Sequence, residues 1–332
     1  MSFNQYTWDL YKQTTIGIEM IKYFSDAGGY VLFKDYCPYA NFIPEDLYND
    51  WLENIYCYGV SDYDHPSSLE EAKDLYISLI TLGIRVEGQQ WLPANDFKNM
   101  LGIIQPMSYV LSQFAPEYFF PYLFLCRIFE LNKIADFFNI DLPNIPKRTD
   151  YKGRCMYYWE LCEVFYLFRK ENGLSPADLW SFLYDFAPNN LPSEKIDMPK
   201  PSQVWFIGGR LYQEDKSLES KFWQSSPETK KGDILVHYET SPISAITCIE
   251  ISLTDGVIDP LFRYYGCIYI GNRINIPHIT LKELQTDEYF FKRPLVRKNF
   301  QGVNGWSVNS ENYSELLRMI KTKGFDIEVL PK

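Results

Sequence analysis

The spacing of hydrophobic residues is helical through the first part of the chain. Within residues 157–168, Leu161, Val164, Phe165 and Phe168 recur every three or four positions, which places them on one face of a helix. The same spacing predicts helices over residues 44–56, over residues 118–138 and after Ser175.

Two of these stretches begin with residues that favour a helix start. Residues 67–71 (SSLEE) offer a capping box in either of two registers, ahead of a helix that runs to about Leu82. Residues 175–178 (SPAD) supply an N-cap serine, a proline at the first helical position and an acid in the first turn. The first part of the chain is therefore expected to be mostly α-helical.

The period changes to that of strands in the second part of the chain. Residues 243–252 alternate apolar with mostly more polar positions, which is typical of a half-buried strand. Short apolar runs at residues 204–207, 233–239 and 264–270 also predict strands, and residues 311–321 predict a closing helix. The expected fold class is thus α+β, with a small β-barrel or curled sheet after the helices.

A proline-rich stretch separates the two patterns. Residues 187–201 read APNNLPSEKIDMPKP, and prolines at this density block both helices and central strands. We expect a helical domain over residues 1–187, an extended linker over 188–201 and a barrel-like domain over 202–332.

Composition and charge agree with two folded domains of different character. The chain has 332 residues, of which 46% are hydrophobic and 23% charged, as in folded globular proteins. The net charge is −11, but residues 200–332 contain 17 basic and 16 acidic side chains, which leaves −12 to residues 1–199. The acidic charge argues against a phosphate backbone lying along the helical domain, whereas the second domain has a net charge near zero and is not excluded as a nucleic-acid surface.

Other features of the sequence exclude several classes of protein. The chain begins without a basic and apolar leader, and its longest uncharged run, residues 99–116, is too polar to span a bilayer. The seven cysteines are scattered without a CxxC pair, as expected of reduced thiols in the cytoplasm. Phosphate-loop, nucleophile-elbow and HExxH motifs are absent, so we expect no metal or cofactor. Together with the cysteines and the lack of an apolar span, this predicts a cytoplasmic protein with no membrane segment.

Short segments in a fixed order make residues 202–325 similar to the PUA-like superfamily, and within it to the EVE domains. The most specific of them are a Lys-Gly-Asp strand start and a late Phe-Gln-Gly ahead of the closing helix. The segments are VWFI at 204–207, KFW at 221–223, KGDILVHY at 231–238, IP at 276–277, LKEL at 281–284 and RKNFQG at 297–302. The resemblance does not reach residues 1–190.

The resemblance implies a domain that grips one nucleobase in an aromatic pocket. Related domains read modified bases in RNA or DNA, and some belong to bacterial antiviral defence. The expected pocket walls are Trp205, Trp223, Tyr238, Phe300 and Trp306, and the expected readers of the base edge are Asp233 and Gln301. In so small a barrel the alternative is that most of these aromatic rings belong to the core.

The densest basic stretch lies just before the Phe-Gln-Gly segment. Its four charged residues are Lys292, Arg293, Arg297 and Lys298. They are candidates to hold phosphates beside the pocket, with a solvated hairpin face as the alternative.

Three functions fit these features. The leading one is nucleic-acid binding through recognition of a modified base, with modified DNA preferred to RNA. One alternative is a DNA glycosylase-type enzyme that removes a flipped modified base, although no residue stands out as catalytic. The other is an adaptor whose acidic helical domain docks an effector protein.

Overall fold

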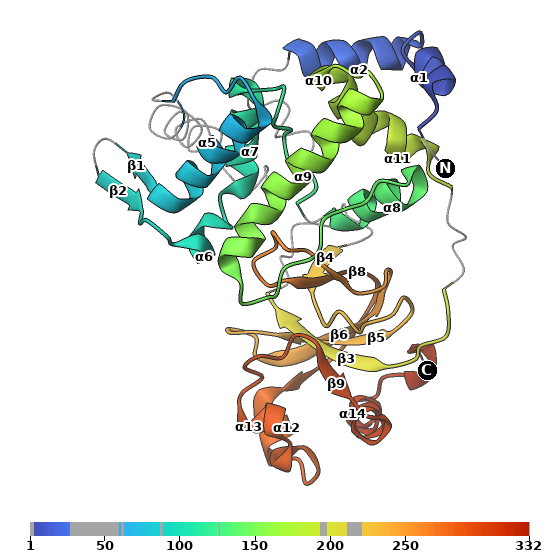
Figure 1. Cartoon of the computed structure of the whole chain (residues 1–332). Coiled ribbons are helices and arrows are strands. Elements are labelled where there is room, and N and C mark those ends of the chain that lie inside the picture. The colour runs from blue at the N-terminus through green and yellow to red at the C-terminus, as the bar shows by residue number, and fades with distance from the viewer. Residues whose placement is uncertain are drawn as a thin grey trace. The chain divides into compact units, whose positions relative to one another are not determined.

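A computed structural model describes residues 3–26, 60, 63–86, 89–125, 127–192, 198–210 and 221–331. The architecture is mixed α/β, and the chain divides into two compact units (Figure 1). Unit 1 comprises Met1–Ser193 together with Asp259–Arg263, and unit 2 comprises Glu194–Ile258 and Tyr264–Lys332. Nothing in the sequence pattern indicated that five residues from the middle of the strand-rich part belong with the helices.

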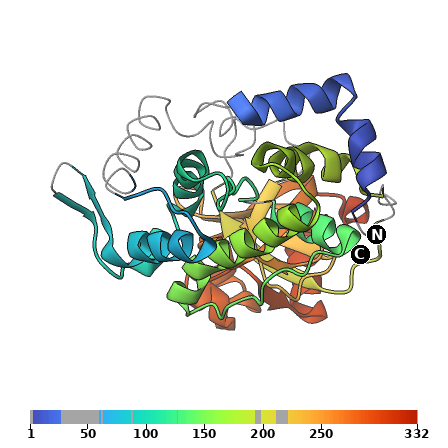
Figure 2. The ribbon, with the colours of Figure 1, turned by 45° about the horizontal axis from the view of Figure 1, so that its top comes forward.

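Unit 1 is built from helices and one short hairpin. The hairpin of β1 (Ile84–Val86) and β2 (Gln89–Leu92) extends from the end of α5, away from the other described helices of this unit (Figures 1 and 2). The helices are α1 (Gln5–Tyr11), α2 (Thr15–Asp26), α5 (Leu69–Leu82), α6 (Phe97–Met100), α7 (Ile104–Phe114), α8 (Ile128–Phe138), α9 (Tyr151–Glu171), α10 (Pro176–Ser181), the π-helix η3 (Phe182–Phe186) and α11 (Ala187–Asn190).

Local signals set the starts of two of these helices as the sequence predicted. The Ser68 hydroxyl accepts a hydrogen bond from the backbone N–H of Glu71 at the start of α5. At α10, Ser175 and Asp178 form a reciprocal capping box. The helix predicted over residues 157–168 is also confirmed, as the central part of the longer α9. The helix predicted over residues 44–56 lies outside the described residues.

The helix predicted over residues 118–138 is wrong in its first half, because α8 begins only at Ile128. Residues 119–124 are instead a non-helical segment whose side chains are almost fully buried. Side-chain hydroxyls satisfy its backbone: Ser108 accepts from the N–H of Tyr122, and Tyr158 donates to the carbonyl of Phe120. An apolar run buried on every side lacks the polar face that a surface helix needs, so tertiary burial overrides the spacing.

Unit 2 is a curled mixed sheet with a closing helix, as expected in outline. The strand order is β4-β8-β6-β5-β3-β9, with β7 paired to β8, and β3 pairs in parallel with β5 while the other pairs are antiparallel. The strands are β3 (Val204–Gly209), β4 (Lys221–Gln224), β5 (Ile234–Glu239), β6 (Ala245–Ser252), β7 (Val257–Ile258), β8 (Gly266–Thr280) and β9 (Trp306–Val308).

Helices cover one face of this sheet. They are α12 (Leu281–Thr286), α13 (Pro294–Arg297) and the closing helix α14 (Ser310–Thr322), with 3-10 turns η4 (Phe290–Lys292) and η5 (Ile327–Val329). We call the core on this face the Phe300 cluster; among its members are Phe206, Val236, Tyr238, Leu295, Phe300 and Leu316. Residues 243–252 were predicted to be half-buried, yet nearly all of β6 is buried, so both of its faces are covered.

Within the described residues, no helix combines the length and apolar character needed to cross a membrane.

Candidate functional site

The other face of the sheet in unit 2 carries a smaller apolar cluster. We call it the Trp205 cluster: Trp205, Ile207, Leu235, Ile268 and Ile270, with Trp223 packed against it. His237 joins this face because β5 pairs in register with β3, which sets His237 beside Ile207. The rings of Trp223 and His237 meet edge to face, with centroids 4.7 Å apart.

Trp223 owes its position to a glycine on the neighbouring strand. A Cβ atom at Gly209 would lie 2.5 Å from Cζ2 of Trp223, a distance that forces the ring to move. The half-buried indole therefore lies directly on the backbone of β3, at the end of that strand.

A buried polar network lies behind Trp223. His237 and Glu250 are 0% and 2% exposed, and Nδ1 of His237 lies 3.0 Å from Oε2 of Glu250. The guanidinium of Arg273 binds the other carboxylate oxygen, with Nη2 at 2.7 Å and Nε at 2.8 Å. The three side chains come from β5, β6 and β8, which are adjacent strands of the sheet.

The network sets the hydrogen-bonding roles of the His237 ring nitrogens. Burial acts to raise the pKa of Glu250, but the hydrogen bond from His237 and the charge of Arg273 outweigh it and hold this pKa below its usual value. The ionised carboxylate accepts the Nδ1–H of His237, and a neutral imidazole that donates through Nδ1 offers a lone pair at Nε2. Nε2 is buried and has no hydrogen-bond partner among the described residues.

His237, Glu250 and nearby Cys248 could in principle hold a metal ion, since their ligand atoms lie within 4.8 Å of one another. The chemistry of the set opposes this. Burial raises the pKa of the Cys248 thiol to about 12, whereas metal binding needs the thiolate. Arg273 also occupies the carboxylate with a positive charge of its own. The arrangement favours a hydrogen-bonded network over a cation site.

Asp233, expected to read a base edge, is instead fully engaged by the fold. Its Oδ1 accepts from Ser202 N, Ser202 Oγ and Gln203 N, and its Oδ2 accepts from Lys230 N and from Nε1 of Trp205. The residue is 1% exposed. These five bonds anchor the start of β3 to the start of β5 and hold the Trp205 ring in the core.

The expected aromatic walls do not form one pocket, because they divide between the two faces of the sheet. Trp205 and Trp223 belong to the Trp205 cluster, whereas Tyr238 and Phe300 lie in the Phe300 cluster. The rings of Tyr238 and Phe300 stack in parallel with centroids 4.0 Å apart, and Phe206 meets Phe300 edge-on. Rings in direct contact leave no space for a base between them, so this pair is part of the core.

The two remaining pocket candidates lie at the surface. Gln301 is exposed in the turn after α13. Trp306 is 40% exposed on β9, where it pairs with Phe206 of β3. Neither is a member of the Trp205 cluster.

The basic stretch lies on the helix-covered side of the sheet. Lys292, Arg297 and Lys298 are exposed, whereas Arg293 stacks over the ring of Tyr289 at 3.9 Å. Their elements, η4 and α13, place Phe290, Leu295 and Val296 in the Phe300 cluster. The stretch is therefore adjacent to Phe300, one of the expected pocket walls, whereas Trp223 belongs to the cluster on the other face of the sheet.

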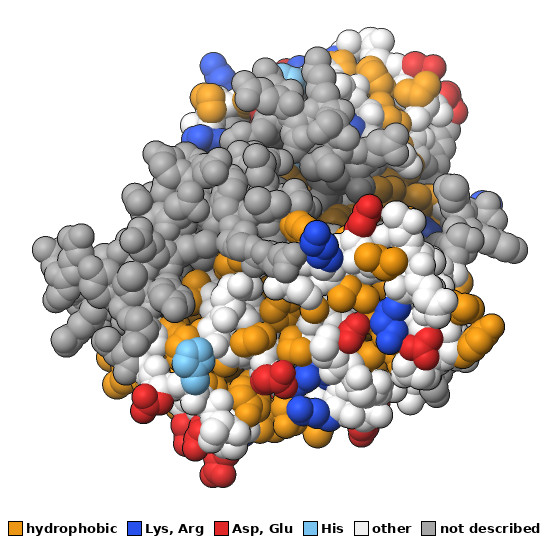
Figure 3. Space-filling view, turned by 90° about the horizontal axis from the view of Figure 1, so that it is seen from above, with side chains coloured by type: hydrophobic (Ala, Val, Ile, Leu, Met, Phe, Trp, Pro, Cys, Tyr) orange, Lys and Arg blue, Asp and Glu red, His pale blue; other side chains and the backbone are white. Residues whose placement is uncertain are grey.

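Basic side chains do not gather on the coloured part of the face that Figure 3 displays. Among the side chains coloured there, Lys and Arg lie singly or in small groups beside acidic and hydrophobic ones. This pattern gives the coloured part of that face no continuous positive stripe along which a phosphate backbone would track.

His237, Glu250 and Arg273 were not among the residues predicted to form a site. A signal was present for two of them: His237 interrupts the apolar run ILVHYE, and Glu250 stands between Ile249 and Ile251. A polar residue in the middle of a strand covered on both faces needs a partner, and each of these supplies one to the other. Arg273 gave no such signal, because its partner lies 23 positions away.

The chain was compared with protein families, curated proteins and solved structures. Protein-family models and curated proteins yield no match to the chain. Among solved structures it is similar to the NMR structure of Rpa0253 from Rhodopseudomonas palustris, a Northeast structural genomics consortium target, with 14% sequence identity and a TM-score of 0.31. The match covers 36% of this chain and 94% of the other.

Proposed function

We propose that unit 2 binds nucleic acid and reads a single unstacked base against Trp223 and His237. One observation carries the proposal: a half-buried indole packs against a buried imidazole whose Nε2 has no partner among the described residues. The similarity of residues 202–325 to PUA-like and EVE domains supports the same function, with modified DNA as the favoured ligand.

Each of the two residues has a distinct role in this proposal. The Trp223 ring supplies a stacking surface, which contributes roughly 1–3 kcal/mol per base and works with any base. The His237 ring is 0% exposed, so binding has to shift the half-buried Trp223 ring before Nε2 can accept a hydrogen bond from the base edge. A base that presents an N–H or O–H donor there, such as an exocyclic amino or a hydroxylated group, would then be selected. Glu250, itself held by Arg273, orients the imidazole through Nδ1.

The network favours binding over base excision. A glycosylase needs a carboxylate that can face the sugar and stabilise positive charge on it. Of the acidic residues around the Trp205 cluster, Glu250 is held by His237 and Arg273 and Asp233 is held by five donors. A reader of bases therefore fits these side chains better than an enzyme that removes them.

The test compares single-stranded oligonucleotides that carry modified or unmodified cytosine, at low salt, with binding followed by fluorescence anisotropy. Trp223→Ala is expected to weaken binding about tenfold or more, because it removes the stacking surface. Trp223→Phe keeps a ring and is expected to retain most of the affinity.

Trp306→Ala is the matched control, since it removes an exposed tryptophan from the same unit, outside the Trp205 cluster. It is expected to bind like the unmodified chain. Undetectable binding of every oligonucleotide by the folded chain at low salt would refute the function. A loss with Trp306→Ala and not with Trp223→Ala would refute the site.

A further inference from the structure

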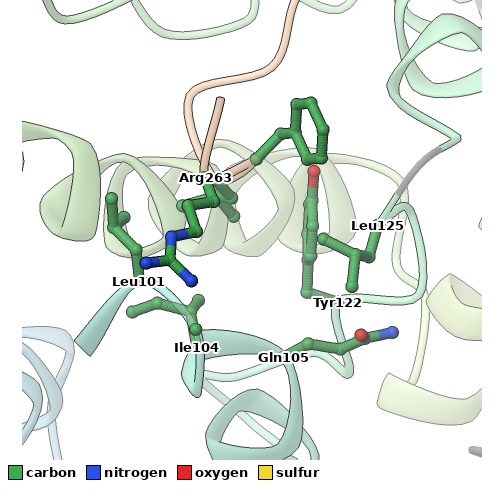
Figure 4. A pocket seen from close by; sticks show the side chains of 9 residues that line it. Leu101, Ile104, Gln105, Tyr122, Leu125 and Arg263 are labelled. Atoms are coloured by element: carbon green, nitrogen blue, oxygen red, sulfur yellow. The ribbon is translucent and has the colours of Figure 1, made fainter. Parts of the chain in front are cut away.

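Unit 1 contains a cavity that the proposed function does not use. Its volume is about 190 Å³. Three stretches of unit 1 line it: the turn between α6 and α7 with the first residues of α7, the non-helical segment before α8, and the inserted segment Asp259–Arg263 (Figure 4). The lining residues include Leu101, Ile104, Gln105, Tyr122, Leu125 and Arg263.

The walls are apolar and held in place. Leu101, Ile104, Tyr122 and Leu261 are each at most 5% exposed. Side chains fixed this firmly by their neighbours form a cavity before any ligand arrives, which keeps the cost of ordering low.

Buried charged residues fix the wall that the inserted segment provides. The guanidinium of Arg154, which is 1% exposed, donates to the carbonyls of Pro260 at 2.8 Å and Phe262 at 2.7 Å. The carboxylate of Asp259 accepts from the backbone N–H groups of Leu261 and Phe262. Hydrogen bonds to its carbonyl groups and from its N–H groups therefore hold the inserted segment in place.

Two polar groups reach this otherwise apolar space. Arg263 is exposed, and Figure 4 shows its guanidinium turned toward Leu101 and Ile104. Among the described residues it forms no ion pair, and a guanidinium matches the two oxygens of a carboxylate. The amide of Gln105 is the second group, on a residue only 6% exposed.

We propose that this cavity binds a monocyclic aromatic carboxylate, with the ring among the apolar walls and the carboxylate on Arg263. Size supports a single ring, because a cavity of about 150 Å³ in another protein admits benzene. The cavity here leaves room for one ring and a small substituent, and the arginine selects an anionic substituent over a neutral or cationic one.

The test is calorimetric titration of the full chain with benzoate, phenol and benzylamine. Benzoate is expected to bind with a dissociation constant in the millimolar range or below, and more tightly than phenol, while benzylamine is expected not to bind. Arg263→Gln is expected to weaken benzoate about tenfold, to the level of phenol. The matched control Arg148→Gln removes an exposed arginine from elsewhere in unit 1 and is expected to leave binding unchanged.

A second pair of variants tests the position of the ring. Leu125→Phe adds bulk to a wall of the cavity and is expected to abolish benzoate binding, whereas Leu167→Phe adds the same bulk on the exposed face of α9 and is expected not to. Absence of benzoate binding to the folded chain at tens of millimolar would overturn the proposal. Equal affinities of the Arg263→Gln variant and the unmodified chain would overturn it as well.

Discussion

Asp259 is a buried carboxyl whose ionised form is disfavoured by the protein. It is fully buried, its Oδ1 accepts two backbone N–H groups, and its Oδ2 has no hydrogen-bond partner among the described residues. Burial raises the pKa of Asp259 to about 7, against the opposing effects of those two hydrogen bonds and of the Arg154 charge. The folded protein therefore binds this proton more tightly than the unfolded chain does.

The raised pKa sets the direction of a pH effect on stability. The contribution of Asp259 to the free energy of unfolding is largest below about pH 4, and it falls as the pH rises to about 7. A shift of this size corresponds to a loss on the order of 4 kcal/mol across that interval. Asp259→Asn keeps the acceptor oxygen and cannot ionise, so we expect a smaller drop in stability between pH 5 and pH 8.

Chemical denaturation of the unmodified and Asp259→Asn chains at both pH values measures this difference. Asp255→Asn is the control, because the backbone N–H of Lys231 lowers the pKa of Asp255, which is thus ionised at both values. An identical pH dependence for the unmodified and Asp259→Asn chains would contradict the assigned role of Asp259.

At the scale of elements, the close approach of β3 and β4 depends on one glycine. Gly209→Ala would place a methyl group 2.5 Å from the indole of Trp223 and push the ring off the strand. We expect a loss of about 1–3 kcal/mol of stability from this overpacking, together with weaker oligonucleotide binding. Unfolding curves measure the loss of stability, and fluorescence anisotropy of the oligonucleotides measures the loss of binding.

A double variant shows whether the ring itself is the obstacle. Trp223→Phe frees the volume that the new methyl group needs, so the combination of Gly209→Ala with Trp223→Phe should cost less stability than the sum of the two single changes. Simple additivity would mean that the alanine acts through some contact other than Trp223.

The features that can be predicted from the sequence are those set by residues close together along the chain. Helix starts at Ser68 and Ser175 and the closing helix α14 follow from neighbouring residues, and the structure confirms them. The segment at residues 119–124 departs from its predicted helix because distant hydroxyls, such as that of Tyr158, satisfy its backbone. The division of Trp223 and Phe300 between two faces depends on which strands pair, and strand order cannot be read from the spacing of residues along one strand.

At the scale of the whole molecule, the two units cannot be separated by a single cut in the linker. A chain that ends at residue 198 lacks Asp259–Arg263, which belongs to unit 1. Arg154 would then lose the carbonyl acceptors of Pro260 and Phe262, to which its Nε and Nη2 donate. The loss of two hydrogen bonds from a buried charged group costs about 3 kcal/mol or more, so we expect the shortened chain to lack a cooperative unfolding transition.

Restoring the missing piece supplies the control. A chain in which residues 255–266 follow residue 198 through a glycine-serine linker is expected to regain a cooperative thermal transition, as followed by circular dichroism. A shortened chain that unfolds as cooperatively without the added residues would show that the inserted segment is dispensable.

The insertion also bears on the order of events during synthesis. Unit 1 takes its last five residues from a point about 65 positions beyond the end of its main stretch, with β3 to β7 made in between. At about 5–20 residues per second, the ribosome needs several seconds to add them. Throughout that interval the nascent helices lack the two carbonyls to which Arg154 donates and one wall of the cavity, so unit 1 can complete its packing only after Arg263 has been added.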